Sequence, residues 1–343
     1  IIALHATSVG TPYLSLFARM NNFQKEHLDE EFYMKRHLVR LEAMRGTLFI
    51  TSIELAPTLY QATKMPEPEL LKRLQERGIS PLEYDKLSGK LHTVLKGGGK
   101  TLPEIRKAIP KEIVRTIELR VGKTLYKMTN VNVILNAMMR KGIVVSEKAR
   151  RTLLITEANR YMLFREAYPN LDLASIKNEE AITMLVKRYI KAFGPVTEED
   201  ITWWTGLHKT QIKQALTAME KELLHTKILN FKREYLTLKS DYEQLAKFKP
   251  SETHSISLLP YEDPYTKGYK IRDRIVDEEL EKRAYIGGGV QPTILLDGKI
   301  IGTWKTWQDI EKGKGPIKLH FFGQPKKDVE KDAIQKAKAI GRL

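Results

Sequence analysis

One arrangement of local signals occurs twice in this chain, and it limits the folds that the sequence can adopt. In the first copy, Thr101 and Glu104 have the spacing of a capping box and predict a short helix that ends before Pro110. A second helix is predicted over residues 131–140 and ends at Gly142. Two short strands come next, predicted over 143–145 and 152–156, and the connection between them, 146–151, is basic.

The second copy begins about 80 residues later. A helix over 180–193 is stopped by Gly194-Pro195, and Thr197 with Asp200 three residues on predicts the start of the next helix. After a turn at Gly206, the remaining predicted elements are a helix over 209–223 and two strands, 227–231 and 235–238, that flank the basic pair Lys232-Arg233.

Helix, helix and a hairpin with a basic tip is the order of elements in a winged helix, whose second helix enters the major groove while the hairpin contacts phosphates. The sequence therefore predicts an α+β fold with two tandem winged-helix units. The candidate DNA contacts are the polar and basic side chains of the second helix and wing of each unit, namely Asn132, Asn136, Arg140, Arg150, Arg151, Lys209, Lys213, Lys232 and Arg233. For any single basic cluster, a merely solvated face is the alternative interpretation.

The regions on either side of these units differ in character. Residues 1–75 carry apolar side chains at helix-compatible spacing and are predicted to be helical. After Lys249-Pro250 the sequence becomes rich in strand signals, and Asp297-Gly298 is a two-residue hairpin loop. Lys299 and Lys305, at or near this hairpin, are candidate phosphate contacts, and the tail from Lys326 is predicted to be a charged surface helix. The predicted parts are a helical region (1–96), two winged-helix units (97–172 and 173–245) and a β-rich domain (246–343).

The charge balance favours a polyanionic partner. The chain has 58 Lys and Arg against 42 Asp and Glu, a net charge of +16. Double-stranded DNA is the expected partner; RNA or an acidic membrane surface would rest on charge alone. No run of 18 apolar residues occurs, so we predict no membrane span and a cytoplasmic protein. Because the sequence starts with Ile1, we expect further residues to precede it in the natural protein.

Several kinds of chemistry find no support in the sequence. The chain has no cysteine, which excludes disulfides, Cys-ligated zinc and thiol nucleophiles. Its 8 histidines show no metal-ligand spacing, and the chain has no P-loop, dinucleotide fingerprint or G-x-S-x-G elbow. We interpret Gly97-Gly98-Gly99 as a linker. We predict no metal and no cofactor.

Short motifs succeed one another in a set order along nearly the whole chain. They are Leu4-His5-Ala6-Thr7, Leu16-Phe17-Ala18-Arg19, Met44-Arg45-Gly46-Thr47-Leu48, Arg188-Tyr189 to Gly194-Pro195, Trp204-Thr205-Gly206-Leu207, Leu258-Leu259-Pro260, Asp263-Pro264-Tyr265, Gly268-Tyr269, Pro292–Gly298 and Gly302-Thr303-Trp304. Each is modest by itself, but jointly they are specific. The chain resembles the AlkZ/YcaQ-type winged-helix DNA glycosylases.

This resemblance implies tandem winged-helix units that form a concave, basic DNA channel, with a β-rich C-terminal region presenting a hairpin to the duplex. It also implies removal of N7-alkylated purines in base excision repair and, in some members, unhooking of interstrand crosslinks. Arg45 and Thr47 match the family's Arg-Gly-Thr segment and would line the channel or cap a helix. Asp263 also matches a family position, and we expect it to make a structural hydrogen bond.

The catalytic signature of the resembled family is a short Gln-x-Gln or Gln-x-Asp motif, and the corresponding positions here read His5-Ala6-Thr7. The family's motif side chains hold a water for attack on C1′ of the sugar. A neutral histidine could accept the proton of that water, so His5 and Thr7 are the candidate catalytic residues. Because Thr7 is shorter than Gln or Asp, it would reach the water only through a second water.

Two functions are compatible with these residues. The first is a monomeric, monofunctional glycosylase for cationic alkylpurines in duplex DNA; no lysine occupies the motif to form a Schiff base. The alternative is a non-catalytic winged-helix DNA-binding protein, a regulator or damage-recognition factor, in which His5 and Thr7 are ordinary helix-surface residues. Both predict salt-sensitive binding to duplex DNA.

Overall fold

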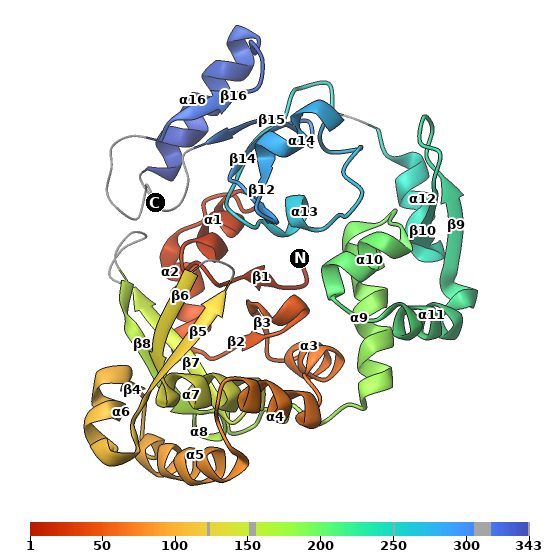
Figure 1. The fold of residues 1–343 in the computed structure, drawn as a ribbon. Helices are drawn as coiled ribbons and strands as arrows, with labels where there is room; N and C mark the ends of the chain where they lie inside the picture. Colours follow the sequence, from red (N-terminus) through yellow and green to blue (C-terminus); the bar gives the residue numbers. More distant parts are fainter. Residues whose placement is uncertain (122–123, 151–155, 250, 305–316, 342–343) are drawn as a thin grey trace.

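Helices and antiparallel strands surround a short N-terminal strand at the centre of the molecule (Figure 1). The computed structural model describes residues 1–343 except 122–123, 151–155, 250, 305–316 and 342–343. Every strand pair within these residues is antiparallel, which confirms the predicted α+β class. Among the described residues, no helix has the length and apolar character that a membrane span requires.

The N-terminal region contains a three-stranded sheet in the order β1-β3-β2, so the prediction that residues 1–75 are helical is wrong for these strands. The elements are β1 (Leu4–His5), α1 (Thr11–Phe17), α2 (Lys25–Asp29), a π-helical turn η1 (Glu30–Met34), β2 (Leu38–Glu42), a 3₁₀ turn η2 (Met44–Gly46), β3 (Leu48–Ser52), α3 (Ala56–Thr63) and α4 (Glu67–Glu76).

The wrong helical prediction has a physical cause in the way β2 and β3 are buried. The middle residues of both strands are buried without alternation, for example Val39, Arg40 and Leu41 in succession. A short apolar run that is buried on both faces does not show the period of two that distinguishes a strand from a helix. Leu38 and Leu41, which suggest a helix by their spacing, instead belong to β2 and pair with Ser52 and Phe49.

The first repeated module contains the predicted helices and an additional hairpin between them. Its elements are α5 (Pro81–Leu95), β4 (Lys100–Thr101), α6 (Leu102–Ala108), a 3₁₀ turn η3 (Lys111–Ile113), β5 (Thr116–Val121), β6 (Thr124–Thr129), α7 (Asn130–Arg140), β7 (Val144–Arg150), β8 (Thr156–Leu163) and α8 (Phe164–Ala167). The capping box between Thr101 and Glu104 is confirmed, since the Glu104 carboxylate accepts from the Thr101 amide at 2.6 Å.

The hairpin β5–β6 is not among the predicted elements, although its apolar residues alternate, as Ile117 and Leu119 show. The predicted wing strand 143–145 is too short, and residues 152–155 of the predicted strand 152–156 lie outside the described part of the chain. Strand β7 continues through most of the basic segment predicted to be a loop, and Arg150 pairs with Thr156 of β8. The ladder extends further because β8 also pairs with β4, which gives the sheet order β4-β8-β7.

The second repeated module agrees more closely with expectation. It consists of α9 (Asn178–Phe193), α10 (Glu198–Thr205), α11 (Lys209–Ala218), a 3₁₀ turn η4 (Glu220–Glu222), β9 (Leu223–Lys227), β10 (Glu234–Leu238) and α12 (Lys239–Lys247). The Thr197–Asp200 capping box and the left-handed turn at Gly206 are confirmed. The helix predicted over 209–223 is too long, because Leu223 already pairs with Leu238 in the β9–β10 hairpin.

The two modules share their connectivity as well as their helices. In each, a short extended segment before the middle helix pairs with the second strand of the hairpin. In the first module this pair is β4 with β8; in the second it is the single bridge between Val196 and Leu236 of β10.

The C-terminal region is built on a four-stranded sheet in the order β11-β14-β15-β16. Its elements are β11 (Ile256–Leu259), α13 (Pro264–Lys267), α14 (Glu278–Ala284), β12 (Tyr285–Ile286), β13 (Gly289–Val290), β14 (Thr293–Leu296), β15 (Lys299–Trp304), β16 (Leu319–Phe321) and α16 (Lys327–Ile340). Asp297 and Gly298 both have positive φ, 50° and 84°, as the predicted tight hairpin loop requires. The predicted surface helix, α16, buries Val329 and Ala333 in the core of this region.

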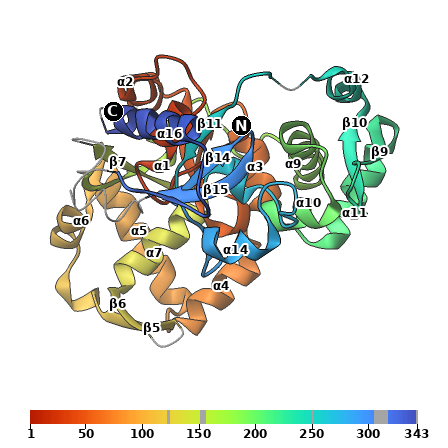
Figure 2. The ribbon, with the colours of Figure 1, turned by 90° about the horizontal axis from the view of Figure 1, so that it is seen from above.

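The hydrophobic cores join segments that are far apart in the sequence. One core contains Leu59 of α3, Leu185 of α9 and Trp204 of α10, and Figures 1 and 2 both show α3 beside α9. A second core contains Leu91 of α5 and Ile134 of α7, on either side of Gly97. The four-part division of the chain stays a prediction about independent folding units. Ile2 and Ala3, directly before strand β1, belong to the first core, whereas Leu4 of β1 packs with Phe32 and Ile50 in a smaller cluster.

Candidate functional site

The segment His5-Ala6-Thr7 lies at the end of strand β1 and not on a helix, contrary to the expectation for residues 1–75. His5 pairs with Phe49 of β3, and the Ala6 amide donates to the Leu48 carbonyl at 2.7 Å. Side chains two residues apart on an extended segment point to the same face. Accordingly, the Thr7 hydroxyl oxygen lies 3.3 Å from Nε2 of His5. The two predicted catalytic side chains therefore form one hydrogen-bonded pair.

Within this pair, His5 lies inside the protein and Thr7 lies at the surface. His5 is 5% exposed, whereas Thr7 is exposed. The His5 ring packs edge-on against Phe49, with 5.6 Å between the ring centroids. Its Nδ1 atom is buried and has no hydrogen-bond partner among the described residues. A small molecule that approaches the pair from solvent therefore meets the Thr7 hydroxyl first.

Burial keeps the His5 imidazole neutral. The pKa of His5 is lowered to about 4, chiefly by burial and also by the nearby cations Arg45, Lys267 and Arg40, while Glu262 opposes the shift. Buried histidines lose the hydration that stabilises their charged form. At pH 7 the ring is therefore neutral, and one of its two nitrogens is free to accept a proton.

Burial of a neutral histidine also makes the fold sensitive to acid. The unfolded chain, with an ordinary His5 pKa of 6.5, binds a proton that the folded chain excludes down to a pH of about 4. This contribution is complete above pH 6.5 and is lost as the pH falls towards 4, by on the order of 3 kcal/mol. We expect the free energy of unfolding in urea to fall more between neutral and acidic pH in the wild type than in His5→Gln. Equal losses would assign the acid sensitivity to other groups.

A second pair near His5, Glu262 with Lys267, was not predicted from the sequence. Glu262 has a positive φ of 56° and is 7% exposed. Its carboxylate accepts from Lys267 at 3.1 Å and from the Val290 amide at 2.7 Å. Burial lowers the pKa of Lys267, and the Glu262 charge opposes that shift. The only sequence signal is the position of Glu262 directly before the Asp263 motif.

Asp263 has the structural role expected of it. The carboxylate is fully buried and accepts four hydrogen bonds, two from Arg19, at 2.6 and 2.9 Å, one from the Ser15 hydroxyl at 2.8 Å and one from the Tyr265 amide at 2.9 Å. The network connects α1 to α13 and so ties the N-terminal region to the C-terminal one.

Arg45 and Thr47 lie at the turn η2, on the chain that leads into β3. Arg45 has a positive φ of 57°, and its guanidinium donates to the Trp203 carbonyl at 3.3 Å. The Thr47 hydroxyl donates to the Met44 carbonyl at 3.2 Å and so closes the turn. Arg45 is close enough to His5 to lower its pKa, whereas the Thr47 hydroxyl is used locally.

In the first module, several predicted DNA contacts already have protein partners. The Asn132 side-chain oxygen accepts from Arg106 at 2.8 Å and from the Thr129 hydroxyl at 2.7 Å, as part of the cap of α7. Arg140 pairs with Glu42 of β2 at 2.9 Å. Asn136 is exposed, Arg150 ends β7, and Arg151 lies outside the described residues. Contacts to DNA by these residues stay predictions.

In the second module and the C-terminal hairpin, the predicted contacts are open to solvent. Lys209 and Lys213 are exposed on α11, Lys232 and Arg233 are exposed between β9 and β10, and Lys299 is exposed at the start of β15. Lys305 lies outside the described residues. The structure therefore leaves these five described side chains available for a polyanion without bringing them next to His5.

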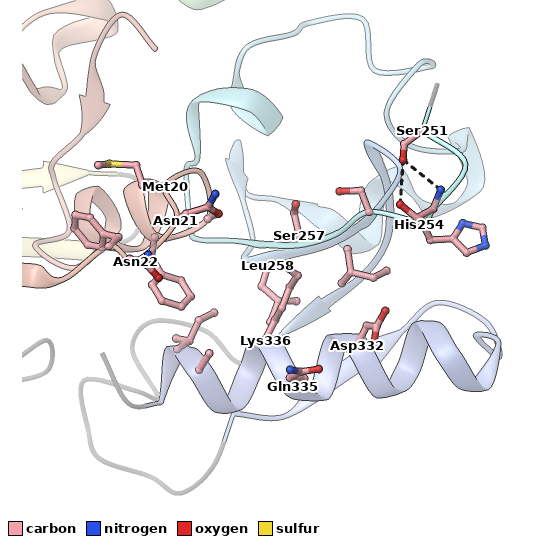
Figure 3. Close-up of a pocket in the computed structure, with 18 residues that line it drawn as sticks. Met20, Asn21, Asn22, Ser251, His254, Ser257, Leu258, Asp332, Gln335 and Lys336 are labelled. Atoms are coloured by element: carbon pink, nitrogen blue, oxygen red, sulfur yellow. Dashed lines mark hydrogen bonds between the residues drawn. The ribbon is translucent and has the colours of Figure 1, made fainter. Parts of the chain in front are cut away.

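A pocket of about 910 Å³ lies elsewhere, between the loop after α1, the start of β11 and helix α16. Figure 3 shows Asn21, Asn22, Ser257 and Lys336 around it. None of the predicted catalytic or DNA-contacting residues lines this pocket. The candidate site is thus defined by the His5–Thr7 pair and the charges around it, and not by this pocket.

Comparisons with known proteins place the fold and the sequence in one family. The family model described as DNA glycosylase AlkZ-like matches residues 1–338. The solved structure of Streptomyces sahachiroi DNA glycosylase AlkZ superposes with a TM-score of 0.72 at 19% identity, over 98% of this chain and 86% of that one, which shows a shared fold. The interstrand DNA cross-link repair glycosylase of the same organism is 28% identical over 169 residues, 48% of this chain and 44% of the relative. The aligned stretch thus spans less than half of that relative. Because the family model covers nearly the whole sequence, the chain belongs to the AlkZ-like DNA glycosylase family.

Proposed function

We propose that this protein is a monofunctional DNA glycosylase that hydrolyses the N-glycosidic bond of N7-alkylated purines in duplex DNA. The observation that carries the proposal is the His5–Thr7 pair, a buried neutral base joined at 3.3 Å to an exposed hydroxyl at the position of the family's motif. Interstrand crosslinks through N7 of guanine are a further substrate, in keeping with the name of the Streptomyces sahachiroi relative.

The reaction needs a general base but no general acid. Alkylation at N7 makes the purine cationic, so it leaves with the electrons of the C1′–N9 bond and needs no proton. Water then adds to C1′ and loses a proton, which passes through the Thr7 hydroxyl to Nε2 of His5. Glu262, the negative charge near His5, stabilises the positive charge that develops on the sugar and on the imidazole.

A Schiff-base step is not part of this proposal. Lys267 is the lysine near His5, but its ammonium donates to Glu262 at 3.1 Å and to the Gly288 carbonyl at 2.6 Å. These contacts occupy the ammonium group and favour its charged form, against the burial that lowers the pKa of Lys267. We therefore expect hydrolysis alone, with an intact abasic strand as product.

The two repeated modules support the DNA-binding part of the proposal. Each has three helices, a short extended segment that pairs with the second hairpin strand, and the hairpin itself, which is the connectivity of a winged helix. In the proposal, these units at 97–172 and 173–245, together with 1–96 and 246–343, form a basic channel around the duplex as a monomer. Lys209, Lys213, Lys232, Arg233 and Lys299 would contact phosphates there.

The proposal is tested by base release. The protein is incubated with duplex DNA that contains one N7-methylguanine, and abasic sites are then cleaved with alkali; we expect strand breaks at the methylated position only. Undamaged duplex is the control for non-specific nicking, and borohydride should trap no covalent complex. No breaks with enzyme in excess would contradict the glycosylase assignment.

A non-catalytic DNA-binding protein is the second candidate. It is favoured by the departure from Gln-x-Gln or Gln-x-Asp to His5-Ala6-Thr7 and by the small exposed fraction of His5. In that case the protein would bind duplex with a strong salt dependence and release no base.

A further inference from the structure

Four cationic side chains surround one indole ring next to the candidate site. Trp203 is half-buried on α10, and the charged groups lie 5.1–5.8 Å from its ring centroid. These groups belong to Arg45, Lys267, Lys270 and Arg272. They come from the turn η2, from α13 and from the segment after α13, so only the tertiary fold brings them together. We call this set the Trp203 cluster.

The Trp203 cluster has more positive than negative charge. Lys267 pairs with Glu262 at 3.1 Å and Arg272 with Glu281 at 2.7 Å. Arg45 and Lys270 form no ion pair with any residue of the described part of the chain. Cation–π attraction to one indole is worth only about 0.5–2 kcal/mol per cation. Two uncompensated charges close together therefore leave a place where an anion would be stabilised.

The positions of Trp203, Arg45 and Lys267 are fixed before any ligand binds. Arg45 has φ +57° and packs against Gly206, where an added Cβ would lie 3.2 Å from the Arg45 amide nitrogen. The Trp203 indole nitrogen donates to the Lys267 carbonyl at 3.2 Å, and Arg45 donates to the Trp203 carbonyl at 3.3 Å. Preorganised donors bind an anion without the cost of ordering flexible side chains.

We propose that the Trp203 cluster binds the phosphodiester that directly flanks the damaged nucleotide, and so holds C1′ of that nucleotide beside the His5–Thr7 pair. This inference rests on the proposed function. Two of its cations, Arg45 and Lys267, act on the His5 ring from nearby. A bound phosphate would cancel their charge, which otherwise opposes both proton uptake by His5 and positive charge on the sugar.

Lys270 is the residue with which to test the phosphate contact, because it is exposed and has no ion pair among the described residues. The probe is a duplex with a tetrahydrofuran abasic analogue, which needs no catalysis. For Lys270→Gln we expect about tenfold weaker binding and a log–log salt slope smaller by about 0.9. The matched control is Lys331→Gln, which replaces an exposed lysine on the outer helix α16 (Figure 1). It should leave the affinity and the salt slope unchanged.

The position of the phosphate is then found by replacing one phosphodiester at a time with a neutral methylphosphonate. Wild-type protein should lose about tenfold in affinity when the linkage flanking the analogue is neutral, and Lys270→Gln should lose little more at that linkage. The proposal would be overturned if wild type and Lys270→Gln lost the same affinity at every linkage. It would also be overturned if the linkage at which they differ were remote from the analogue.

These outcomes are independent of base release. If N7-methylguanine is not excised but Lys270→Gln removes sensitivity at the flanking linkage, the glycosylase proposal fails and the phosphate subsite stands. If excision occurs but the linkage scan is the same for both proteins, the subsite proposal fails alone.

Discussion

Replacing His5 with alanine is expected to lower the rate of N7-methylguanine release by about 10²–10⁴-fold, the range for loss of a positioned general base. Duplex affinity should be almost unchanged, because His5 is 5% exposed and the predicted phosphate contacts lie on other elements. The measurement is single-turnover excision with enzyme in excess, alongside binding of the same duplex. The loss should be found in the excision rate and not in the dissociation constant.

The matched variant for this prediction is His5→Gln, which places the resembled family's usual residue at the first motif position. We expect it to keep more activity than His5→Ala, because an amide can still hold the water although it cannot accept its proton. Thr7→Val, which removes only the hydroxyl, should also slow excision, because Thr7 lies 3.3 Å from His5 Nε2 and is the exposed member of the pair. Unchanged excision by His5→Ala would remove His5 from the site.

Asp263→Ala is expected to destabilise the fold by about 3–5 kcal/mol, the cost of breaking a buried ion pair by removing one partner. The carboxylate is fully buried, and its loss leaves Arg19, the Ser15 hydroxyl and the Tyr265 amide without their acceptor. Because these bonds join α1 to α13, the loss should weaken the attachment of the N-terminal region to the C-terminal one. Urea unfolding monitored by circular dichroism gives the free energy.

The control for Asp263 is Glu69→Ala on α4, which removes an exposed ion pair with Arg73 formed at 2.8 Å between side chains 48% and 47% exposed. Exposed pairs of this kind contribute about 0.3–0.5 kcal/mol. If both variants lost a similar free energy of unfolding, the Asp263 network would not be what holds the N-terminal and C-terminal regions together.

Local signals in the sequence predict the elements that depend on local chemistry. Thr101 with Glu104 and Thr197 with Asp200 satisfy the amide groups at helix starts, a contact that needs only neighbouring residues. Asp297-Gly298 likewise adopts the positive φ values that a tight hairpin loop demands. The order of helices in both repeated modules is predictable for the same reason.

The errors occur where distant segments decide the conformation. Strands β2 and β3 lack the alternation that would identify them as strands, because their middle residues are buried in succession. Residues 219–223 continue the apolar pattern of a helix, but pairing of β9 with β10 places Leu223 in a strand. The hairpin β5–β6 is a different kind of error, because its alternation is visible in the sequence and is missed by the prediction.

The sequence by itself determined the α+β class, the two repeated modules, the family and the pair of side chains that stand at the family's motif. Only the tertiary structure decided what surrounds that pair. Glu262 and Lys267 act electrostatically on His5 although they lie about 260 positions away in the sequence, because the tertiary fold brings them near it. Burial, which no local pattern reports, lowers the pKa of His5 to about 4. The Trp203 cluster arises in the same way: Arg45, Trp203 and the cations of residues 267–272 come from three distant parts of the sequence and become neighbours only through the fold.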